Sequence, residues 1–398
     1  MSANKLRLMK PAILWSFAIA IAASLLVASD YRSRDPDSSL YARLSGDLAR
    51  QPAARWIAPE WGGAWNQEGL FREHPVGILL PSVLLIRAGV PSGQAAYIVN
   101  MLYQAAVIAL IPLVAGVVLR SVEARSLAWI LQLLPVSFAY RIRGNQEHPL
   151  LMCFLALIYG TARARTNPAW VALMVGAFCF LVLVKGAFAM FALVGAALWL
   201  LVMPAPNGAS DRWAWLGLVA SVAAAASMMA GYEALYMRTT GESFLDFYRS
   251  TRLGESIRLS DPSVISHALV NVGWYLLRLA WFAAPWSLIA GAVVWVWLRA
   301  WTQGRVAQTF ELHSARGLTW ALLTTAVFIG ALSPALVRAE RFIFPTYFII
   351  GAVGVVAAMR GSAGVRRFVE PSAGYSWLPV ALWLVTFLLS LVSRAARL

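Results

Sequence analysis

Two aspartates, Asp35 and Asp37, stand at the start of an expected helix and are the clearest candidates for a catalytic base. Asp35 can cap this helix, and Pro36 suits its first helical position. A carboxylate at a helix N-terminus stays ionised near neutral pH, and beside a bound hydroxyl it can accept a proton. The simpler interpretation is that both carboxylates only cap the helix.

A second group of candidates comes from a repeated tripeptide, Glu73-His74-Pro75 and Glu147-His148-Pro149. Each copy begins an apolar segment, and both are expected on the same membrane face. Glutamate and histidine together can bind a divalent cation, so the four side chains form a candidate metal site. They are alternatively ordinary polar side chains at the membrane interface, and no cofactor is then required.

Three single cations, Lys185, Arg278 and Arg341, lie near the ends of apolar runs on that same face. Arginine can hold a phosphate with its planar fork, and lysine can act on it as a point charge. The competing interpretation is that each long side chain extends from its helix end to the membrane surface, and that Glu340 only forms an ion pair with Arg341.

The composition shows what kind of scaffold must position these groups. Of the 398 residues, 60% are hydrophobic and only 13% are charged, about half of the ~25% usual in soluble proteins. Mean hydropathy is +0.67. The net charge of +15 favours anionic lipids and phosphates as partners, and we expect no nucleic-acid partner. The two cysteines, Cys153 and Cys179, lie in apolar runs and are expected to be core residues.

Long apolar runs recur along the whole chain and predict an all-α polytopic membrane protein. Barrel strands would alternate with period two, and these runs do not. We expect about eleven transmembrane helices in one domain, 1–398, and no soluble C-terminal domain. The predicted spans are 11–29, 94–119, 124–140, 148–163, 169–184, 186–203, 213–236, 279–298, 317–336, 342–358 and 378–393.

Arginine and lysine residues fall on every second connection between the spans, and this pattern orients the spans in the membrane. The basic connections are assigned to the cytoplasm, so residues 30–93 and 237–278 become outer loops. The run from Trp170 to Met203 is interpreted as a tight hairpin with Lys185 at its outer turn. A single tilted helix there would reverse every later assignment.

The first outer loop, 30–93, carries an unusual density of charge for so apolar a chain, and ionisable groups at a membrane face are functional candidates. Leu40, Leu44 and Leu48 recur every fourth residue and predict an amphipathic helix lying on the membrane surface. A second juxtamembrane helix is expected after Pro75. The later polar segment 242–263 is expected either to cover a groove or to remain solvated.

Five short motifs, taken in their order along the chain, resemble those of the GT-C superfamily of integral-membrane glycosyltransferases. The similarity is greatest to the branch of the lipid A aminoarabinose transferase and the protein O-mannosyltransferases, and it spans about residues 11 to 358. The matching segments are Asp37-Ser38-Ser39-Leu40-Tyr41, His74-Pro75-Val76-Gly77, Leu183-Val184-Lys185-Gly186, Pro285-Trp286 and Arg341-Phe342-Ile343-Phe344-Pro345.

The resemblance implies inverting transfer of a sugar from a polyprenyl-phosphate donor to a lipid, glycan or protein acceptor. Asp37, with Asp35, would then be catalytic. The donor phosphate would be held by Lys185, Arg341, His74 and Arg278, and the substrates by Tyr41, Glu73, Glu147 and His148. The chain departs from the family's motifs at two positions. Ser38 stands where the family has a second acidic residue, and His74 stands where the family has a lysine, so the charge at that position depends on pH.

The resemblance also implies a bacterial inner membrane, with the active site on its outer face. A transporter or flippase of lipid-linked saccharide is the alternative function. A transporter more often carries polar groups near mid-membrane, whereas the ionisable residues here cluster at one face.

Overall fold

The computed structural model describes residues 35–63, 67–206, 209–253, 264–336 and 338–395, and within these ranges it is helical. The predicted first span, 11–29, lies outside the described residues. The main helices are α2 (Pro36–Arg50), α3 (Leu80–Arg87), α4 (Ser92–Ala115), α5 (Ser121–Ile130), α6 (Pro135–Arg141), α7 (Glu147–Ala164), α8 (Val171–Lys185), α9 (Met190–Val202), α10 (Arg212–Thr240), α11 (Phe244–Phe247), α12 (Val264–Phe282), α13 (Trp286–Thr302), α14 (Val306–Thr309), α15 (Leu312–Leu332), α16 (Phe344–Gly361), α17 (Ala363–Val369) and α18 (Leu378–Ala395).

Short 3₁₀ and π segments connect several of these helices. They are η1 (Ala53–Arg55), η3 (Val76–Ile78), η4 (Leu131–Leu133), η5 (Pro168–Trp170), η6 (Gly186–Ala189), η7 (Tyr248–Leu253), η8 (Glu340–Ile343) and η9 (Glu370–Tyr375).

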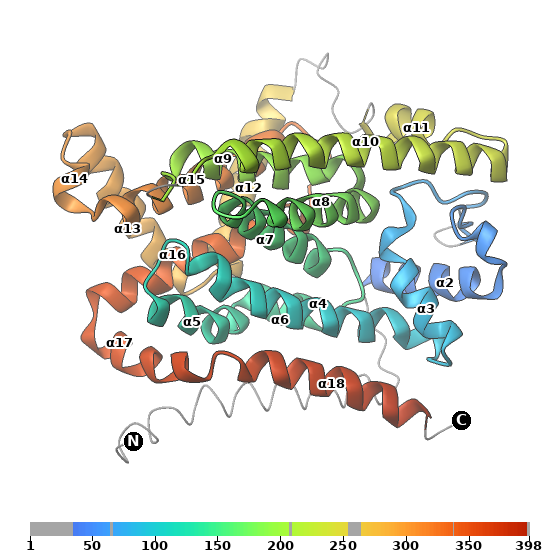
Figure 1. The fold of residues 1–398 in the computed structure, drawn as a ribbon, viewed down its shortest axis with the longest axis horizontal. Coiled ribbons are helices and arrows are strands. Elements are labelled where there is room, and N and C mark those ends of the chain that lie inside the picture. Colours follow the sequence, from blue (N-terminus) through green and yellow to red (C-terminus); the bar gives the residue numbers. More distant parts are fainter. Residues whose placement is uncertain (1–34, 64–66, 207–208, 254–263, 337, 396–398) are drawn as a thin grey trace.

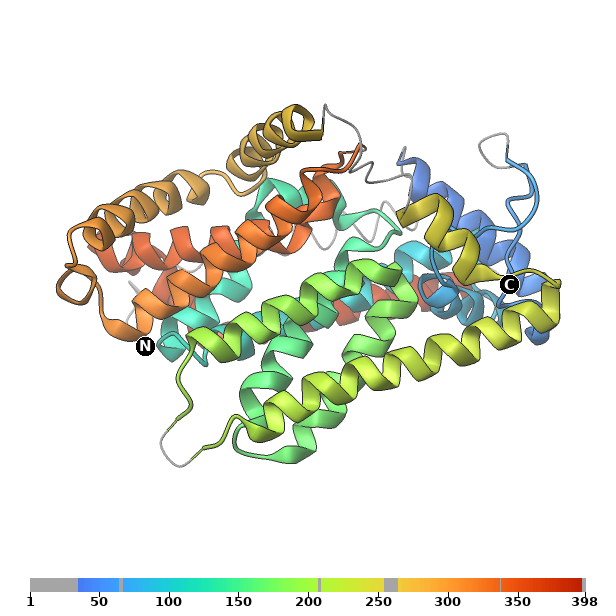
Figure 2. The same cartoon turned by 90° about the horizontal axis from the view of Figure 1, so that it is seen from above.

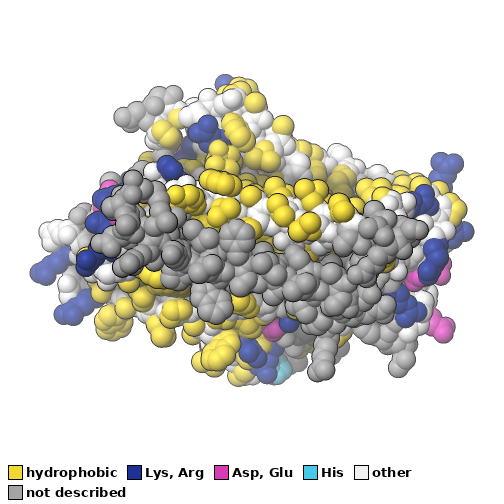
Figure 3. Space-filling model, turned by 90° about the horizontal axis from the view of Figure 1, so that it is seen from below, with side chains coloured by type: hydrophobic (Ala, Val, Ile, Leu, Met, Phe, Trp, Pro, Cys, Tyr) yellow, Lys and Arg dark blue, Asp and Glu magenta, His cyan; other side chains and the backbone are white. Residues whose placement is uncertain are grey.

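The helices form an elongated bundle with two distinct ends (Figure 1). Helices α2, α3 and α11 lie at one end, and α14 and α17 lie at the other. Apolar side chains dominate the surface between the ends, and charged side chains gather mostly toward them (Figure 3). This distribution is expected of a bundle that crosses a bilayer, because lipid tails exclude unpaired charges.

Five helical segments of the described residues are long and apolar enough to cross a membrane, with Pro168–Val202, which contains α8 and α9, counted as one segment. The number is six if the bent α17–α18 unit is one span. The predicted number of about eleven spans is therefore not confirmed. The prediction 124–140 fails as one helix, because η4 and Pro135 divide it into α5 and α6. The predicted span 279–298 overlaps two helices, the end of α12 and most of α13, which Pro285 separates. Helix α12 occupies Val264–Phe282, most of which was predicted to belong to the outer loop 237–278.

The hairpin at Lys185 is confirmed by contacts at both of its ends. Lys185 donates to Gln146, just before α7, so the turn lies at the start of α7. Arg165, just after α7, donates to the carbonyls of Leu200 and Met203 at the end of α9. Helices α8 and α9 therefore run in opposite directions along α7, and α10 packs against α8 (Figure 2).

Helix α2 is amphipathic as predicted, but its apolar face does not lie on lipid. Leu40, Leu44 and Leu48 are at most 3% exposed, and they pack in a cluster with Phe71 and Val83. Periodicity shows that a helix has one apolar face without showing what covers it. Here the cover is protein, and this fixes the start of α2 against the rest of the bundle.

Candidate functional site

Four segments that are distant in sequence meet at the α2 end of the bundle. They are the start of α2, the loop between α6 and α7, the turn between α8 and α9, and η8 just before α16. The contacts that join them are Asp35 with Arg143, Ser38 with Gly144, Asp37 with Arg341, Tyr140 with Glu340, and Lys185 with Gln146. We call the charged groups of these segments, Asp35, Asp37, Arg143, Glu147, Lys185 and Arg341, the charged cluster.

Asp35 caps α2, as the sequence predicts. Its Oδ2 accepts hydrogen bonds from Ser38 N at 3.0 Å and from Ser38 Oγ at 2.7 Å. The same carboxylate accepts from Asn145 Nδ2 at 3.3 Å, and its other oxygen lies 3.2 Å from Arg143. With its oxygens bound in this way and its side chain 9% exposed, Asp35 serves to hold α2 against the α6–α7 loop.

Asp37 forms an ion pair with Arg341, so the candidate base and one candidate phosphate-binding cation are direct neighbours. In the structure the Asp37 side chain is 13% exposed and that of Arg341 is 31% exposed, so both remain within reach of a ligand. Arg341 Nε is buried and lacks a hydrogen-bond partner among the described residues. The guanidinium therefore has donor capacity that Asp37 does not use.

Lys185 is fixed by a turn that only glycine makes without strain. Gly186 has φ +60°, a conformation that residues with a side chain rarely adopt. A Cβ at this position would lie 2.5 Å from Tyr248 Oη, and that hydroxyl accepts a hydrogen bond from Ala187 N at 3.2 Å. The ammonium of Lys185 interacts electrostatically with Glu147 and Glu73. The turn thus presents one cation among two carboxylates.

Gly77 brings the His74-Pro75-Val76-Gly77 motif directly onto this turn. A Cβ at Gly77 would lie 2.6 Å from Leu183 Cβ, so the two backbones approach too closely for any larger residue. His74 itself is 6% exposed. Its Nδ1 donates to Pro75 O at 3.0 Å, which leaves Nε2 to accept from Tyr41 Oη at 3.1 Å when the ring is neutral. In this arrangement His74 positions Tyr41 of α2.

The metal site predicted from Glu73, His74, Glu147 and His148 does not form. No group of three or more histidine, cysteine, aspartate or glutamate side chains suited to a metal ion occurs among the described residues. The two glutamates both act on the ammonium of Lys185, but the two histidine rings have different neighbours. The ring of His148 packs edge-on against Phe344, while that of His74 packs against Tyr41.

Glu147 nevertheless occupies a notable position. Its side chain is 2% exposed, and Oε2 has no hydrogen-bond partner in the described part of the chain. Lys185, Arg143 and Asp35 all act on it electrostatically. A buried carboxylate of this kind is held in place by its cationic neighbours, which makes Glu147 part of the charged cluster.

Arg278 of α12 lies beside the cluster, with its guanidinium carbon 5.0 Å from the ring centroid of Trp274. It acts electrostatically on Tyr347, whose hydroxyl donates to the backbone carbonyl of Glu340 at 2.9 Å. Arg278 is thus linked to η8, the segment that carries Arg341, through one intervening side chain.

Sequence reasoning missed Arg143, Gln146 and Tyr248 as members of the site. Arg143 and Gln146 belong to a short polar stretch between two apolar runs, and that position was the available signal.

The segment beginning at Glu242 adjoins the site through Tyr248, whose hydroxyl accepts from Ala187 N. Arg72 of the first loop lies 2.6 Å from Glu242 and stacks on Phe247 at 4.2 Å, which fastens this segment over the turn.

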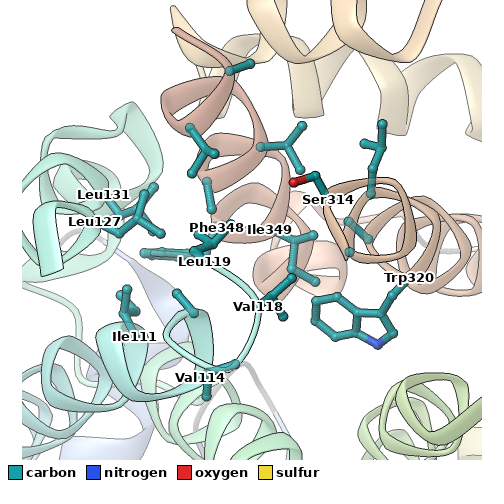
Figure 4. A pocket seen from close by; sticks show the side chains of 18 of the residues that line it. Ile111, Val114, Val118, Leu119, Leu127, Leu131, Ser314, Trp320, Phe348 and Ile349 are labelled. Atoms are coloured by element: carbon teal, nitrogen blue, oxygen red, sulfur yellow. The ribbon is translucent and has the colours of Figure 1, made fainter. Parts of the chain in front are cut away.

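A mostly apolar cavity of about 550 Å³ lies along α16 (Figure 4). One end of its wall is formed by Pro345, four residues after Arg341, and the other end by Arg360. Helices α4, α5, α7 and α15 supply most of the remaining wall. The cavity has the volume of a site for a small molecule or a lipid chain, for which about 300–1,000 Å³ is usual.

Comparisons with solved structures support the fold. The chain is similar to ArnT from Cupriavidus metallidurans bound to undecaprenyl phosphate, with a TM-score of 0.67 and 14% identity over 97% of this chain and 78% of that one. The apo form of the same protein matches with a TM-score of 0.61 and 15% identity, over 97% and 77% of the two chains. No protein-family model and no curated protein matches the sequence. The predicted GT-C-like fold is confirmed.

Proposed function

We propose that this membrane protein is an inverting glycosyltransferase that uses a polyprenyl-phosphate sugar donor. The observation that carries the proposal is the charged cluster, in which Asp37 and Arg341 are directly paired at one end of an apolar bundle. The fold supports it, because a solved structure of the same fold holds undecaprenyl phosphate. A lipid-linked sugar phosphate needs this combination of an apolar bundle for its tail and fixed cations for its phosphate.

In this proposal the donor phosphate binds between Arg341 and Lys185. The planar guanidinium of Arg341 has an unpaired Nε that can donate to the phosphate, and Lys185 adds a point charge from the turn between α8 and α9. As the bond between the sugar and the phosphate breaks, negative charge grows on the leaving phosphate oxygen. Cations already fixed around that oxygen stabilise the transition state more than the ground state.

Binding of the phosphate to Arg341 also weakens the ion pair with Asp37, because the guanidinium charge is then shared between two anions. The carboxylate of Asp37 then accepts the proton of the acceptor's hydroxyl or amine group. The acceptor atom forms a bond to the anomeric carbon as the bond to phosphate breaks, and the electron pair leaves with the polyprenyl phosphate. Direct displacement of the phosphate by the acceptor inverts the anomeric carbon, because the new bond forms on the side opposite to the bond that breaks.

The remaining residues position these groups. Asp35 holds α2 through its cap and through Arg143, His74 orients Tyr41, and Glu147 balances Lys185. We propose that Tyr41, Glu73 and His148 contact the substrates, and that the acceptor is a lipid, a glycan or a protein. The protein would act in a bacterial inner membrane, with the charged cluster on the outer face.

The test is to incubate the purified protein with a panel of labelled polyprenyl-phosphate sugars and a mixed envelope extract. Transfer of label from at least one donor to an acceptor, with release of polyprenyl phosphate, supports the proposal. A flippase would instead move a donor between the leaflets of a proteoliposome and leave its sugar attached. Movement without transfer would replace the proposed function with the alternative one.

A further inference from the structure

The cavity along α16 is polar at one end only. Thr309, Glu311, Ser314 and Arg360 contribute to its wall, and all four lie at the end of the bundle opposite to Arg341. The rest of the wall is almost entirely apolar, as the labelled side chains of Figure 4 show. An amphiphile would therefore enter with its head group at the Arg360 end and its hydrocarbon toward Pro345.

The length of the cavity fits one hydrocarbon chain of one leaflet. Its wall follows α16 from Pro345 to Arg360, which is about 22 Å at 1.5 Å per residue. Half of a bilayer's hydrocarbon core is about 15 Å thick. An acyl chain anchored at the Arg360 end can therefore lie fully inside the bundle.

The charges at the Arg360 end select the head group. Arg360 donates from Nε and Nη2 to Glu123 at 2.8 Å each, and from Nη1 to Ser314 Oγ at 2.5 Å. Burial acts to raise the pKa of the Glu123 carboxyl, but the hydrogen bonds and charge of Arg360 outweigh it and lower the pKa. Both members of this pair are thus charged and neutralise each other, and Arg360 is the member that lines the cavity.

Beyond that pair the cavity wall carries one carboxylate, Glu311, which acts electrostatically on Arg360, and exposed arginines surround this end of the bundle. Arg120 adjoins it directly, because its backbone N donates to Glu123 at 3.2 Å while its side chain is exposed. Other exposed arginines at this end of the bundle are Arg125, Arg305 and Arg367. A phosphate group placed at the polar end of the cavity would meet several cations and gain electrostatic energy.

We propose that this cavity binds an acyl chain of an anionic phospholipid from the leaflet at the Arg360 end, with its phosphate held by Arg120 and its neighbours. With the predicted topology this is the inner leaflet, so the bound lipid is distinct from the sugar donor. The donor's own tail is a poorer occupant. It would start from a phosphate at Arg341 and end against the polar groups of Glu311 and Ser314.

The probe is phosphatidylglycerol with a diazirine at the end of one acyl chain, added to the full-length protein in phosphatidylcholine nanodiscs. The expected crosslinks fall on apolar wall residues toward the Pro345 end, such as Leu151 and Phe348. Unlabelled phosphatidylglycerol should compete for them, and undecaprenyl phosphate should not. The readout is binding alone, so it does not depend on the proposed transfer reaction.

Two variants test the wall and the charge separately. Ala352→Phe places a ring in the cavity and should lower crosslinking about tenfold. The matched control, Ala331→Phe, adds the same ring to an exposed position of α15 and should change nothing. Arg120→Gln, at the surface, should remove most of the preference for phosphatidylglycerol over a phosphatidylcholine probe, and it remains informative if Ala352→Phe does not fold.

Several results would overturn this assignment. Crosslinks confined to the lipid-facing surface would show that no chain enters the cavity. Competition by undecaprenyl phosphate alone would assign the cavity to the donor tail. Equal labelling by the anionic and zwitterionic probes in the wild-type protein would remove the role given to the arginines.

Discussion

Replacing Asp37 with asparagine separates catalysis from structure at the charged cluster. The substitution keeps the shape of the side chain and an oxygen that can still accept from Arg341, but it removes the base. Loss of a positioned general base typically costs about 10²–10⁴-fold in rate, equal to roughly 2.7–5.4 kcal/mol in the activation barrier. Transfer should therefore fall by at least about 100-fold.

The same change should have little effect on folding. The ion pair of Asp37 with Arg341 is partly open to solvent, at 13% and 31% side-chain exposure. Such a pair is worth about 1 kcal/mol at most, the upper part of the range for exposed pairs. Donor binding, measured with undecaprenyl phosphate, should persist or become tighter, because Arg341 no longer has a carboxylate competing with the phosphate.

Asp35→Asn is the matched control, because it makes the same chemical change two residues earlier. Asparagine still caps a helix, but it loses the charge that holds Arg143 at 3.2 Å in a more buried pair. Hydrogen bonds to charged groups contribute about 1.5–3 kcal/mol, so this variant should unfold at a lower temperature than Asp37→Asn.

Initial transfer rates and unfolding temperatures of both variants decide the question. If Asp35→Asn abolishes transfer in a folded protein while Asp37→Asn retains it, the wrong carboxylate has been assigned. Near-normal transfer in both would refute base catalysis at this loop.

Three further predictions address the cations and the topology. Arg341→Ala should reduce transfer by roughly two orders of magnitude or more, and Arg341→Lys should lose much of it because the fork is gone; normal turnover in a folded variant would exclude the phosphate clamp. Gly186→Ala should destabilise the protein by about 1–3 kcal/mol in thermal unfolding and slow transfer, since its φ is positive and Tyr248 blocks the Cβ. Gly176→Ala, within the preceding helix α8 and with open space around it, should do neither, and equal effects would contradict the argument. Single cysteines at exposed outer positions should react with an impermeant thiol reagent in intact cells, and labelling only after permeabilisation would reverse the assigned face. The three positions are Ser39, Ala187 and Ser250.

Local signals predicted the local structure well. Asp35 followed by Pro36 marked the start of α2, and Lys185-Gly186 marked a turn, because both signals act through the backbone of their own neighbours. The pairing of Asp37 with Arg341 had no such signal. It joins the two halves of the chain and depends on how α2 and α16 pack.

The missed helix boundaries have physical causes as well. The helix α12 was assigned to a loop because Asn271 and Arg278 lower the hydropathy of its sequence. In the structure Asn271 donates to the carbonyls of Ser333 and Ala335, so this polar group is satisfied inside the bundle. The run 124–140 concealed a break because two of the three residues of η4, Leu131 and Leu133, continue the apolar pattern. Gln132 and Pro135 were the local warnings.

The central claim is that the charged cluster transfers a sugar from a polyprenyl phosphate. Its most direct test is to follow both products of one reaction with purified protein, a doubly labelled polyprenyl-phosphate sugar and an envelope acceptor fraction. We predict that sugar label appears on the acceptor with inverted anomeric configuration, in equal amount to the polyprenyl phosphate released, and that Asp37→Asn abolishes both. No release from any donor of the panel, or release that Asp37→Asn leaves unchanged, would contradict the account.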